Sequence, residues 1–286
     1  MITNVLQDKV VLYHGNCLDG FSGAWVARKK FGNEAFYYGL NLYAEVPVWL
    51  KDKEVYFIDF CYETEIMKKI IAENKKVVLI DHHLAREEIM GLVSDSLIDI
   101  THCGSVLAWK YFFPEEKMPK LLDFIEDGDI WVWKNEYAKE VLNAISLRAF
   151  TFENWDDLAC ITEDENLIKG LIHDGSIISE YQNRLIDGLV KTADEVEFDG
   201  ERALIVNTPI LTSETGHALA RNGFKIGILW NQEGRNIKVS LRGDGTINLA
   251  ELAKNHGGGG HHNASGFSFK EDQNAPWNLI ERKVDK

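Results

Sequence analysis

The N-terminal third of the chain alternates between short hydrophobic runs and helix-like segments, and this alternation constrains the fold more than any other feature. The hydrophobic runs cover residues 10–13, 55–58 and 77–80, and helical spacing covers residues 20–31 and 64–72. Strands made of consecutive apolar residues are typical of a parallel sheet that helices bury on both faces. The sequence therefore predicts an α/β fold with a parallel sheet in its N-terminal part.

The remainder of the chain predicts a second, smaller α/β domain. Helical patterning covers residues 103–113, 119–126 and about 164–191, and strand-like runs cover residues 203–206, 226–230 and 237–241. Glycine-containing turns punctuate the later runs. We therefore expect residues 1–190 to form the larger domain, which ends in a helical connector, and residues 191–286 to form the smaller one.

Composition narrows the classes of partner and compartment. The formal net charge of −14 argues against a broad basic face that grips long duplex DNA. Apolar runs are too short to span a bilayer, and the N-terminus lacks a signal-peptide core, so we expect no membrane association. The four cysteines lack CxxC spacing, which is typical of reduced thiols in a cytoplasmic protein.

Polar residues follow each of the three early strands. His14 and Asp19 follow the first strand, Asp59 follows the second, and the tripeptide Asp81-His82-His83 follows the third. Because the carboxyl ends of parallel strands meet at one edge of the sheet, these side chains are expected to converge. Imidazole and carboxylate groups together suit divalent cations. A single aspartate after a strand is more often a helix cap or turn residue, and the prediction therefore depends on all three clusters.

Two later motifs carry further candidates. Asp127 and Asp129 flank Gly128 ahead of Trp131, and they could supply a further metal ligand or form a solvated turn. The run 257–260 consists of four glycines and leads into His261. Backbone amides of glycines can approach an anion closely, whereas a flexible linker is the ordinary explanation of such a run.

These motifs, in this order, resemble the DHH phosphoesterase family over nearly the whole chain. The features that carry the resemblance are YHGNCLDG at 13–20, the strand that ends at Asp59, LIDHH at 79–83, Asp127 before Trp131, and GGGGHHNASGF at 257–267. The last stretch looks like the signature of the DHH-associated C-terminal domain.

The resemblance implies a phosphoesterase with two metal ions, usually Mn²⁺. It implies that His14 and Asp19 each bind one metal, that Asp59 bridges the two, and that His82 and Asp127 complete the second position. Asp81 would be an orienting or minor ligand, and His83 a phosphate contact or proton donor, so that the catalytic residues are His83, Asp59 and Asp81.

The resemblance also implies an active-site cleft between the two domains. In the smaller domain the substrate would contact His261, the amides of Gly258, Gly259 and Gly260, and Arg242. Two cations can activate a water and neutralise phosphoryl oxygens during in-line attack.

The chain departs from the family pattern in its first motif. Many members carry an extra aspartate between the first histidine and Asp19, whereas this chain has Asn16 and Cys17 there. One metal position is therefore expected to be weaker, or to favour Co²⁺ or Zn²⁺, and Mg²⁺ is a further alternative to Mn²⁺.

Among family members, a compact two-domain chain most resembles the nanoRNase type, which degrades short oligonucleotides to mononucleotides. The alternatives are an exopolyphosphatase, a phosphodiesterase of cyclic or linear dinucleotides, and a 3′-phosphonucleotide phosphatase. A further alternative, which is not an enzyme, is a nucleotide-binding protein whose metal centre has lost its function. The sequence leaves a monomer and a homodimer both open.

Overall fold

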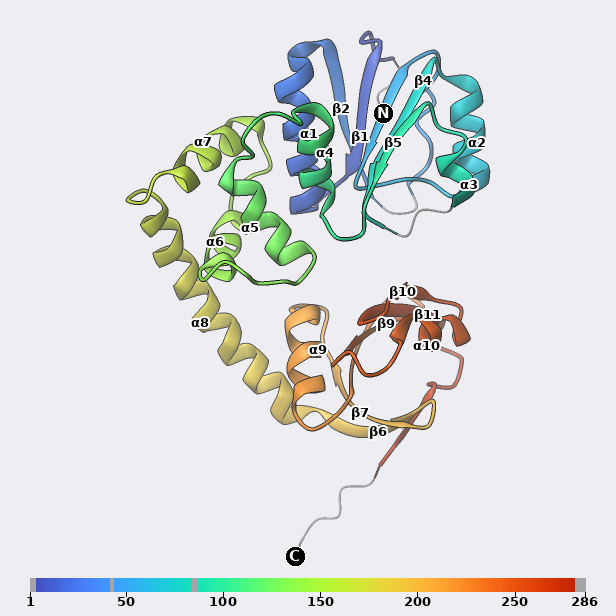
Figure 1. Cartoon of the computed structure of the whole chain (residues 1–286). Helices are drawn as coiled ribbons and strands as arrows, with labels where there is room; N and C mark the ends of the chain where they lie inside the picture. The colour runs from blue at the N-terminus through green and yellow to red at the C-terminus, as the bar shows by residue number, and fades with distance from the viewer. Residues whose placement is uncertain (1–3, 42–43, 84–86, 281–286) are drawn as a thin grey trace, which may run out of the picture. The chain divides into compact units, whose positions relative to one another are not determined.

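The computed structural model describes residues 4–41, 44–83 and 87–280. The chain divides into two compact units, Met1–Ser179 and Glu180–Lys286, which are drawn from blue to red along the chain in Figure 1. This division falls inside helix α8 (Ile168–Thr192), the helical connector that the sequence predicts. The predicted boundary at 190 lies in the same helix and stays a prediction.

The first unit contains the predicted parallel sheet. Its strands lie in the order β2-β1-β3-β4-β5, and every neighbouring pair is parallel. The strands are β1 (Lys9–His14), β2 (Ala35–Leu40), β3 (Glu54–Ile58), β4 (Lys76–Asp81) and β5 (Asp95–Ile98). The expected α/β fold with a parallel N-terminal sheet is confirmed.

Helices cover both faces of this sheet because its central strands are apolar on both sides (Figure 1). Helices α1 (Leu18–Phe31) and α4 (Gly104–Phe112) cover one face, and α2 (Thr64–Glu73) and α3 (Glu87–Met90) cover the other. Successive strand residues point to opposite faces. Accordingly Val11 packs with Trp25 of α1, whereas Val10 and Leu12 belong to the cluster that contains Met67 of α2.

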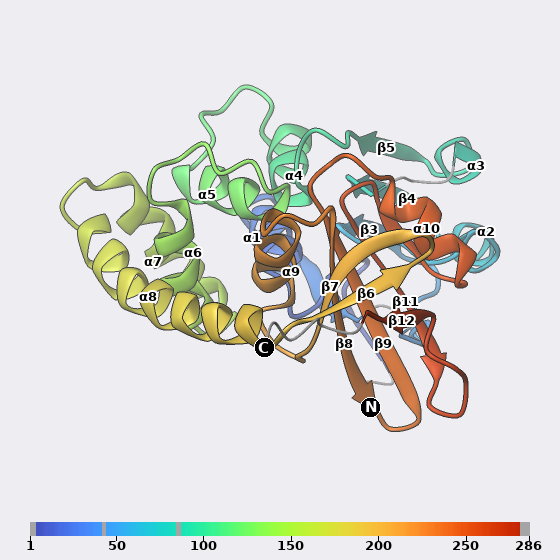
Figure 2. The same cartoon turned by 90° about the horizontal axis from the view of Figure 1, so that it is seen from below.

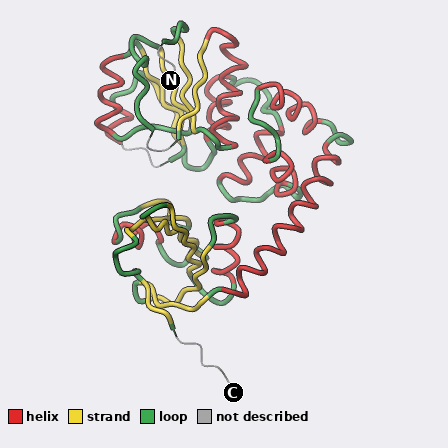
Figure 3. Tube along the Cα trace, turned by 180° about the vertical axis from the view of Figure 1, so that it is seen from behind, coloured by secondary structure: helices red, strands yellow, loops and turns green. Residues whose placement is uncertain are grey.

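A helical layer follows α4 along the chain and appears in red in Figure 3. It consists of α5 (Lys120–Asp129), α6 (Ala138–Ser146), α7 (Phe152–Glu163) and the start of α8. Trp155 of α7 is fully buried against α1, where its indole N–H donates to Ser22 Oγ at 2.7 Å. Within the described part of the chain, no helix has the length and apolar character needed to cross a membrane.

The second unit is a mixed sheet with a helix on each face. Its order is β10-β11-β9-β8-β7-β6-β12, in which only β7 and β8 pair in parallel (Figure 2). The strands are β6 (Asp194–Phe198), β7 (Glu201–Asn207), β8 (Ile226–Glu233), β9 (Asn236–Gly243), β10 (Gly259–His261), β11 (Ala264–Lys270) and β12 (Trp277–Leu279). Leu219 of α9 (Thr212–Arg221) and Leu249 of α10 (Leu249–Asn255) pack in separate clusters on this sheet.

Close packing explains two of the four glycines of residues 257–260. A Cβ on Gly258 would lie 2.1 Å from the carbonyl oxygen of Gly266, and one on Gly260 would lie 2.6 Å from that of Ala264. Gly260 also has a φ of +141°, whereas a Cβ on Gly259 would meet nothing within 4 Å. The run therefore has a structural role in the β10–β11 hairpin, whatever its amides bind.

We expect Gly258→Ala to destabilise the second unit by about 1–3 kcal/mol, because the added methyl group overpacks the hairpin. Gly259→Ala is the matched control, and its effect should stay within about 1 kcal/mol because the position has open space. Urea denaturation of both variants measures the difference. Equal stability of the two variants would contradict the packing explanation.

Candidate metal centre

Three neighbouring strands deliver the predicted polar residues to one edge of the first sheet. His14 is the last residue of β1, Asp59 directly follows β3, and Asp81 is the last residue of β4. These strands are adjacent in the order β1-β3-β4, so their carboxyl ends lie side by side. This juxtaposition follows from the parallel topology.

Asp59 lies at the middle of this edge and faces two histidines. Its Oδ2 is 3.4 Å from His14 Nδ1, and its Oδ1 is 3.2 Å from His82 Nε2. The carboxylate is almost completely buried. The backbone of Asp59 adopts a φ of +55°, a left-handed conformation that costs free energy in a non-glycine residue.

Asp19 is held by the first backbone amides of α4. Its Oδ2 accepts from Gly104 N at 2.6 Å and its Oδ1 accepts from Ser105 N at 2.8 Å, while Oδ2 lies 4.0 Å from His82 Nε2. A Cβ on Gly104 would lie 2.7 Å from the Cβ of Asp59 and 2.8 Å from Asp19 Oδ2. A glycine at this position therefore allows α4 to approach both carboxylates.

Asp129, rather than Asp127, reaches His82. Asp129 Oδ2 lies 3.5 Å from His82 Nε2. Asp127 Oδ2 instead accepts from the backbone and side-chain nitrogens of Asn135 at 2.7 and 2.6 Å. Among the described residues, the buried Asp127 Oδ1 has no hydrogen-bond partner, and Asp127 is in none of the candidate ligand groups. The structure does not bring Asp127 to the cluster, and its ligand role stays a prediction.

The reason is helical geometry. The sequence pattern ends the helix near residue 126, but α5 continues to Asp129, so that both carboxylates lie in its last turn. Residues two apart on a helix point in different directions. The sequence motif therefore predicted a carboxylate beside the other ligands, and the length of α5 decides whether Asp127 or Asp129 turns toward His82.

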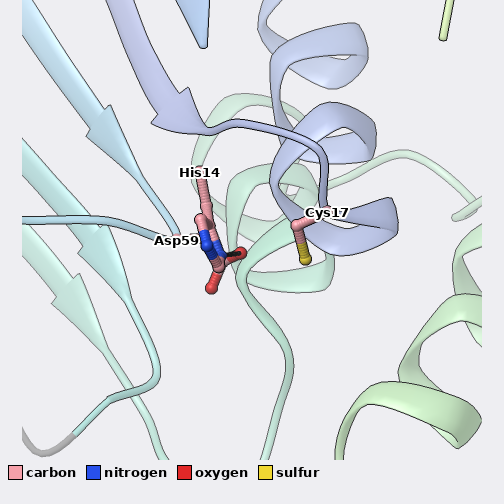
Figure 4. Close-up of side chains that lie close together, drawn as sticks. All are labelled: His14, Cys17 and Asp59. Atoms are coloured by element: carbon pink, nitrogen blue, oxygen red, sulfur yellow. Dashed lines mark ion pairs between the residues drawn. The ribbon is translucent and has the colours of Figure 1, made fainter. Parts of the chain in front are cut away.

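Three overlapping groups of side chains could hold a divalent cation. They are His14 with Cys17 and Asp59, Asp59 with His82 and His83, and Asp19 with His82 and Asp129, and within each group the ligand atoms lie within 4.8 Å of one another. Figure 4 shows the first of these groups. Asp59 and His82 are each shared between two groups.

The spacings fit a metal better than they fit direct hydrogen bonds. Nitrogen–oxygen distances of 3.2–3.5 Å around Asp59 and His82 exceed the usual 2.7–2.9 Å of a charge-assisted hydrogen bond. Ligands about 2.0–2.2 Å from one ion at tetrahedral angles are about 3.3–3.6 Å apart. The donor set of imidazoles and carboxylates also suits a divalent transition metal, so the residues present fit such a cation.

Asp81 orients the two histidines that follow it. Its Oδ1 accepts from the backbone nitrogens of His82 and His83 at 2.8 and 3.1 Å and contacts His83 Nδ1 at 2.8 Å. A carboxylate that holds one ring nitrogen fixes the orientation of the imidazole. The His83 side chain is 49% exposed, so its ring is accessible to a bound molecule.

The electrostatics of the cluster favour added positive charge. Burial and the nearby Asp59 charge raise the pKa of Asp19, and burial and Asp19 raise the pKa of Asp129 well above its usual range. Burial alone would raise the pKa of Asp59, but the facing imidazoles of His14 and His82 outweigh it and lower that pKa. Burial opposes protonation of His82, yet the facing Asp59 carboxylate and the other surrounding carboxylates raise its pKa to about 9.

The predicted substrate residues of the second unit lie on β9 and on or just before β10, two strands that β11 separates in the sheet. Arg242 of β9 donates from Nη2 to Ser213 Oγ at 3.0 Å and from Nη1 to the Leu241 carbonyl at 2.9 Å. His261 is the exposed last residue of β10, which Gly259 and Gly260 begin. Their substrate contacts stay a prediction.

Comparison with known proteins gives one domain match in the second unit and two relatives that align with nearly the whole chain. Residues 205–282 match the model of the DHHA1 domain. The chain is 28% identical to the uncharacterized protein R106 of Acanthamoeba polyphaga mimivirus, over 94% of this chain and 69% of that protein. It is 25% identical to the oligoribonuclease NrnB of Bacillus subtilis (strain 168), over 91% of this chain and 73% of that protein.

Solved structures share the fold at low sequence identity. The DHH domain of PF0399, described as a member of the s1p family of ribosomal proteins, aligns with a TM-score of 0.60 at 14% identity, over 92% of this chain and 82% of that one. The pGpG-specific phosphodiesterase PggH from Vibrio cholerae aligns with a TM-score of 0.50 at 13% identity, over 93% and 94%.

The fold and the site define an α/β protein with a candidate metal centre at the carboxyl edge of a parallel sheet and a DHHA1 domain near its C-terminus. With its DHHA1 domain at residues 205–282, the chain resembles the DHH family of phosphoesterases, whose members are metal-dependent hydrolases of phosphoester bonds. The resemblance inferred from the sequence motifs is confirmed.

We expect Asp129→Asn to weaken Mn²⁺ binding at least roughly tenfold, because it removes a carboxylate beside His82. Asp127→Asn should keep the Mn²⁺ affinity and instead lower the free energy of unfolding by about 1–3 kcal/mol, because its buried bonds to Asn135 are disturbed. Calorimetric Mn²⁺ titration and urea denaturation separate the two effects. Loss of Mn²⁺ binding in Asp127→Asn alone would instead support the ligand role predicted for Asp127.

The raised pKa of His82 predicts how the chelator-treated protein responds to pH. Because the folded-state pKa of about 9 exceeds the ordinary value of 6.5, protonation of His82 stabilises the fold fully below pH 6.5. This stability is lost as the pH rises through 9. We expect the free energy of unfolding to fall across this interval and the fall to be smaller in His82→Gln. Identical pH profiles for both proteins would contradict this assignment.

Proposed function

We propose that the protein is a metal-dependent phosphodiesterase that hydrolyses short oligonucleotides to mononucleotides. The observation that carries the proposal is the position of Asp59, whose two oxygens face two different imidazoles across ligand-like distances. One carboxylate can thereby be shared by two cation positions. The likeness to oligoribonuclease NrnB over 91% of the chain supports the class of substrate.

In this proposal the first unit holds two cations and the phosphate. His14 and Asp59 belong to one position, and Asp19, His82 and Asp129 belong to the other, with Asp59 shared. Two such cations, when bound, activate water and stabilise the charge that develops on the phosphoryl oxygens.

His83 is proposed to contact the phosphate or to donate a proton to the leaving oxygen. Asp81 Oδ1 contacts His83 Nδ1 at 2.8 Å and so fixes the orientation of the imidazole. The pKa of His83 is raised, first by this hydrogen bond to Asp81, so that a larger fraction of the imidazole carries the proton that a general acid needs. His83 also lies 3.7 Å from Asp59 Oδ1, within the same cluster.

The second unit is proposed to bind the remainder of the substrate. The guanidinium of Arg242 is held in one orientation by Ser213 and by the Leu241 carbonyl, and such a group suits a phosphate. The exposed His261 follows the glycine run, where the amides of Gly258, Gly259 and Gly260 complete the set of proposed contacts. A short substrate has few phosphates, which agrees with the net charge of −14.

A linear dinucleotide is the second candidate substrate. The likeness to the pGpG-specific phosphodiesterase PggH extends over 93% of the chain and shows a shared fold. A dinucleotide and a short oligonucleotide present the same phosphodiester to the metal centre, and they differ only in the length of chain beyond it. Substrate length therefore has to be decided by product analysis.

Purified protein with Mn²⁺ should release mononucleotides from a short RNA, and a chelator should stop this release. A dinucleotide, a cyclic dinucleotide, a 3′-phosphorylated nucleotide and polyphosphate are assayed in parallel. Asp59→Asn should lower the rate at least about 100-fold, because a shared ligand of both cations is removed. Asp187→Asn, an exposed carboxylate of α8, is the matched control and should keep the wild-type rate.

Several outcomes bear on this proposal. Faster release of mononucleotides from the dinucleotide than from the short RNA would favour the dinucleotide as the substrate. Full activity in a folded Asp59→Asn variant would refute the shared-ligand arrangement. No hydrolysis of any substrate by protein with metal bound would refute the proposed substrates, and no metal binding at all would favour a non-catalytic nucleotide-binding protein.

A further inference from the structure

We infer that Cys17 is a metal ligand and that the group His14–Cys17–Asp59 selects a thiophilic divalent cation such as Zn²⁺ or Co²⁺. The two cation positions would then differ in their metal preference, with the sulfur-containing position distinct from the carboxylate-rich one. This inference rests on the proposed function and names the metal class of one of its positions.

A tight turn places the thiol beside the end of β1. Gly15 N donates to the Leu40 carbonyl of the neighbouring strand β2 at 2.7 Å, and the chain then turns at Asn16, whose φ is +57°, before α1 begins. Cys17 is the residue that precedes α1. In Figure 4 its sulfur points to the same side of the turn as the His14 ring and the Asp59 carboxylate. The sulfur, a nitrogen of His14 and an oxygen of Asp59 all lie within 4.8 Å of one another.

The surroundings of Cys17 differ from those of two other cysteines of this unit. Cys103 belongs to the hydrophobic cluster beneath α1 and α4, and Cys61 packs against the cluster on the opposite face of the sheet. Cys17 is partly exposed, and among the described residues it belongs to neither cluster. Packing explains Cys103 and Cys61, whereas the neighbours of Cys17 are an imidazole and a carboxylate.

The chemistry of the donor sets separates the two positions. Thiolate is a soft ligand that favours zinc and similar ions, and carboxylates favour harder ions such as Mn²⁺ and Mg²⁺. One position offers one sulfur, one imidazole and the shared Asp59, whereas the group at His82 offers the carboxylates of Asp19 and Asp129. A Cys–His–Asp set leaves a fourth tetrahedral position open, as catalytic zinc sites do.

The direct test is the absorption spectrum of the chelated protein after titration with Co²⁺ alone. A cobalt–thiolate bond gives a near-ultraviolet charge-transfer band, which we expect in the wild type and in Cys160→Ser, an exposed thiol that serves as the matched control. The band should be absent from Cys17→Ser. A wild-type protein that binds Co²⁺ without this band overturns the inference, and so does a band that persists in Cys17→Ser.

A second variant keeps the test informative if Cys17→Ser folds poorly. Cys17→Asp replaces sulfur by carboxylate, and we expect the ratio of Zn²⁺ to Mn²⁺ affinity to fall at least about tenfold, measured by competition with a metal-binding dye. An unchanged ratio in a folded Cys17→Asp variant contradicts the inference.

These measurements use no substrate, so they separate the inference from the proposed function. A charge-transfer band without hydrolysis of any phosphodiester would support the thiolate ligand and refute the function. Hydrolysis by a Co²⁺-loaded protein that lacks the band would support the function and refute the thiolate ligand.

Discussion

The carboxylates of Asp19, Asp59 and Asp129 lie around the imidazole of His82. Their mutual repulsion is the main constraint on this edge of the first unit, because the surrounding residues have to offset it. Burial strengthens this repulsion, because water no longer screens the charges. Two backbone amides of α4 offset it for Asp19, and two imidazoles offset it for Asp59. The absence of a side chain at Gly104 allows α4 to approach the carboxylates of Asp19 and Asp59 this closely.

The sequence predicted the parts of this arrangement that depend on strand order. The strands β1, β3 and β4 are runs of apolar residues because they form the middle of the sheet, and a polar residue at the end of each is conspicuous for that reason. The edge strands β2 and β5 escaped prediction. Strand β5 includes Asp95 and Ser96, which an edge tolerates because one side of the strand is open to solvent.

The parts that the sequence could not predict depend on distances of a few ångströms. Whether Asp127 or Asp129 turns toward His82 depends on where α5 ends, and helix ends are poorly marked when no glycine or proline follows directly. The hydrogen bonds from the backbone amides of Gly104 and Ser105 to Asp19 join residues that are far apart in the chain. Likewise, nothing in the run of four glycines distinguishes Gly258, which the hairpin requires, from Gly259, which it does not.

Charge balance connects the two proposals made for this centre. Two divalent cations carry a charge of +4, and the carboxylates of Asp19, Asp59 and Asp129 supply only three negative charges to the candidate ligand groups. A thiolate at Cys17 would supply the fourth, so that the charges of the two proposed cations and of these four ligands would cancel before a phosphodiester enters. With a neutral residue in its place, the centre would keep an excess positive charge in a buried setting, where such a charge is costly. Under the two proposals, the side chain at position 17 would therefore affect both the choice of metal and the strength with which the centre attracts an anionic substrate.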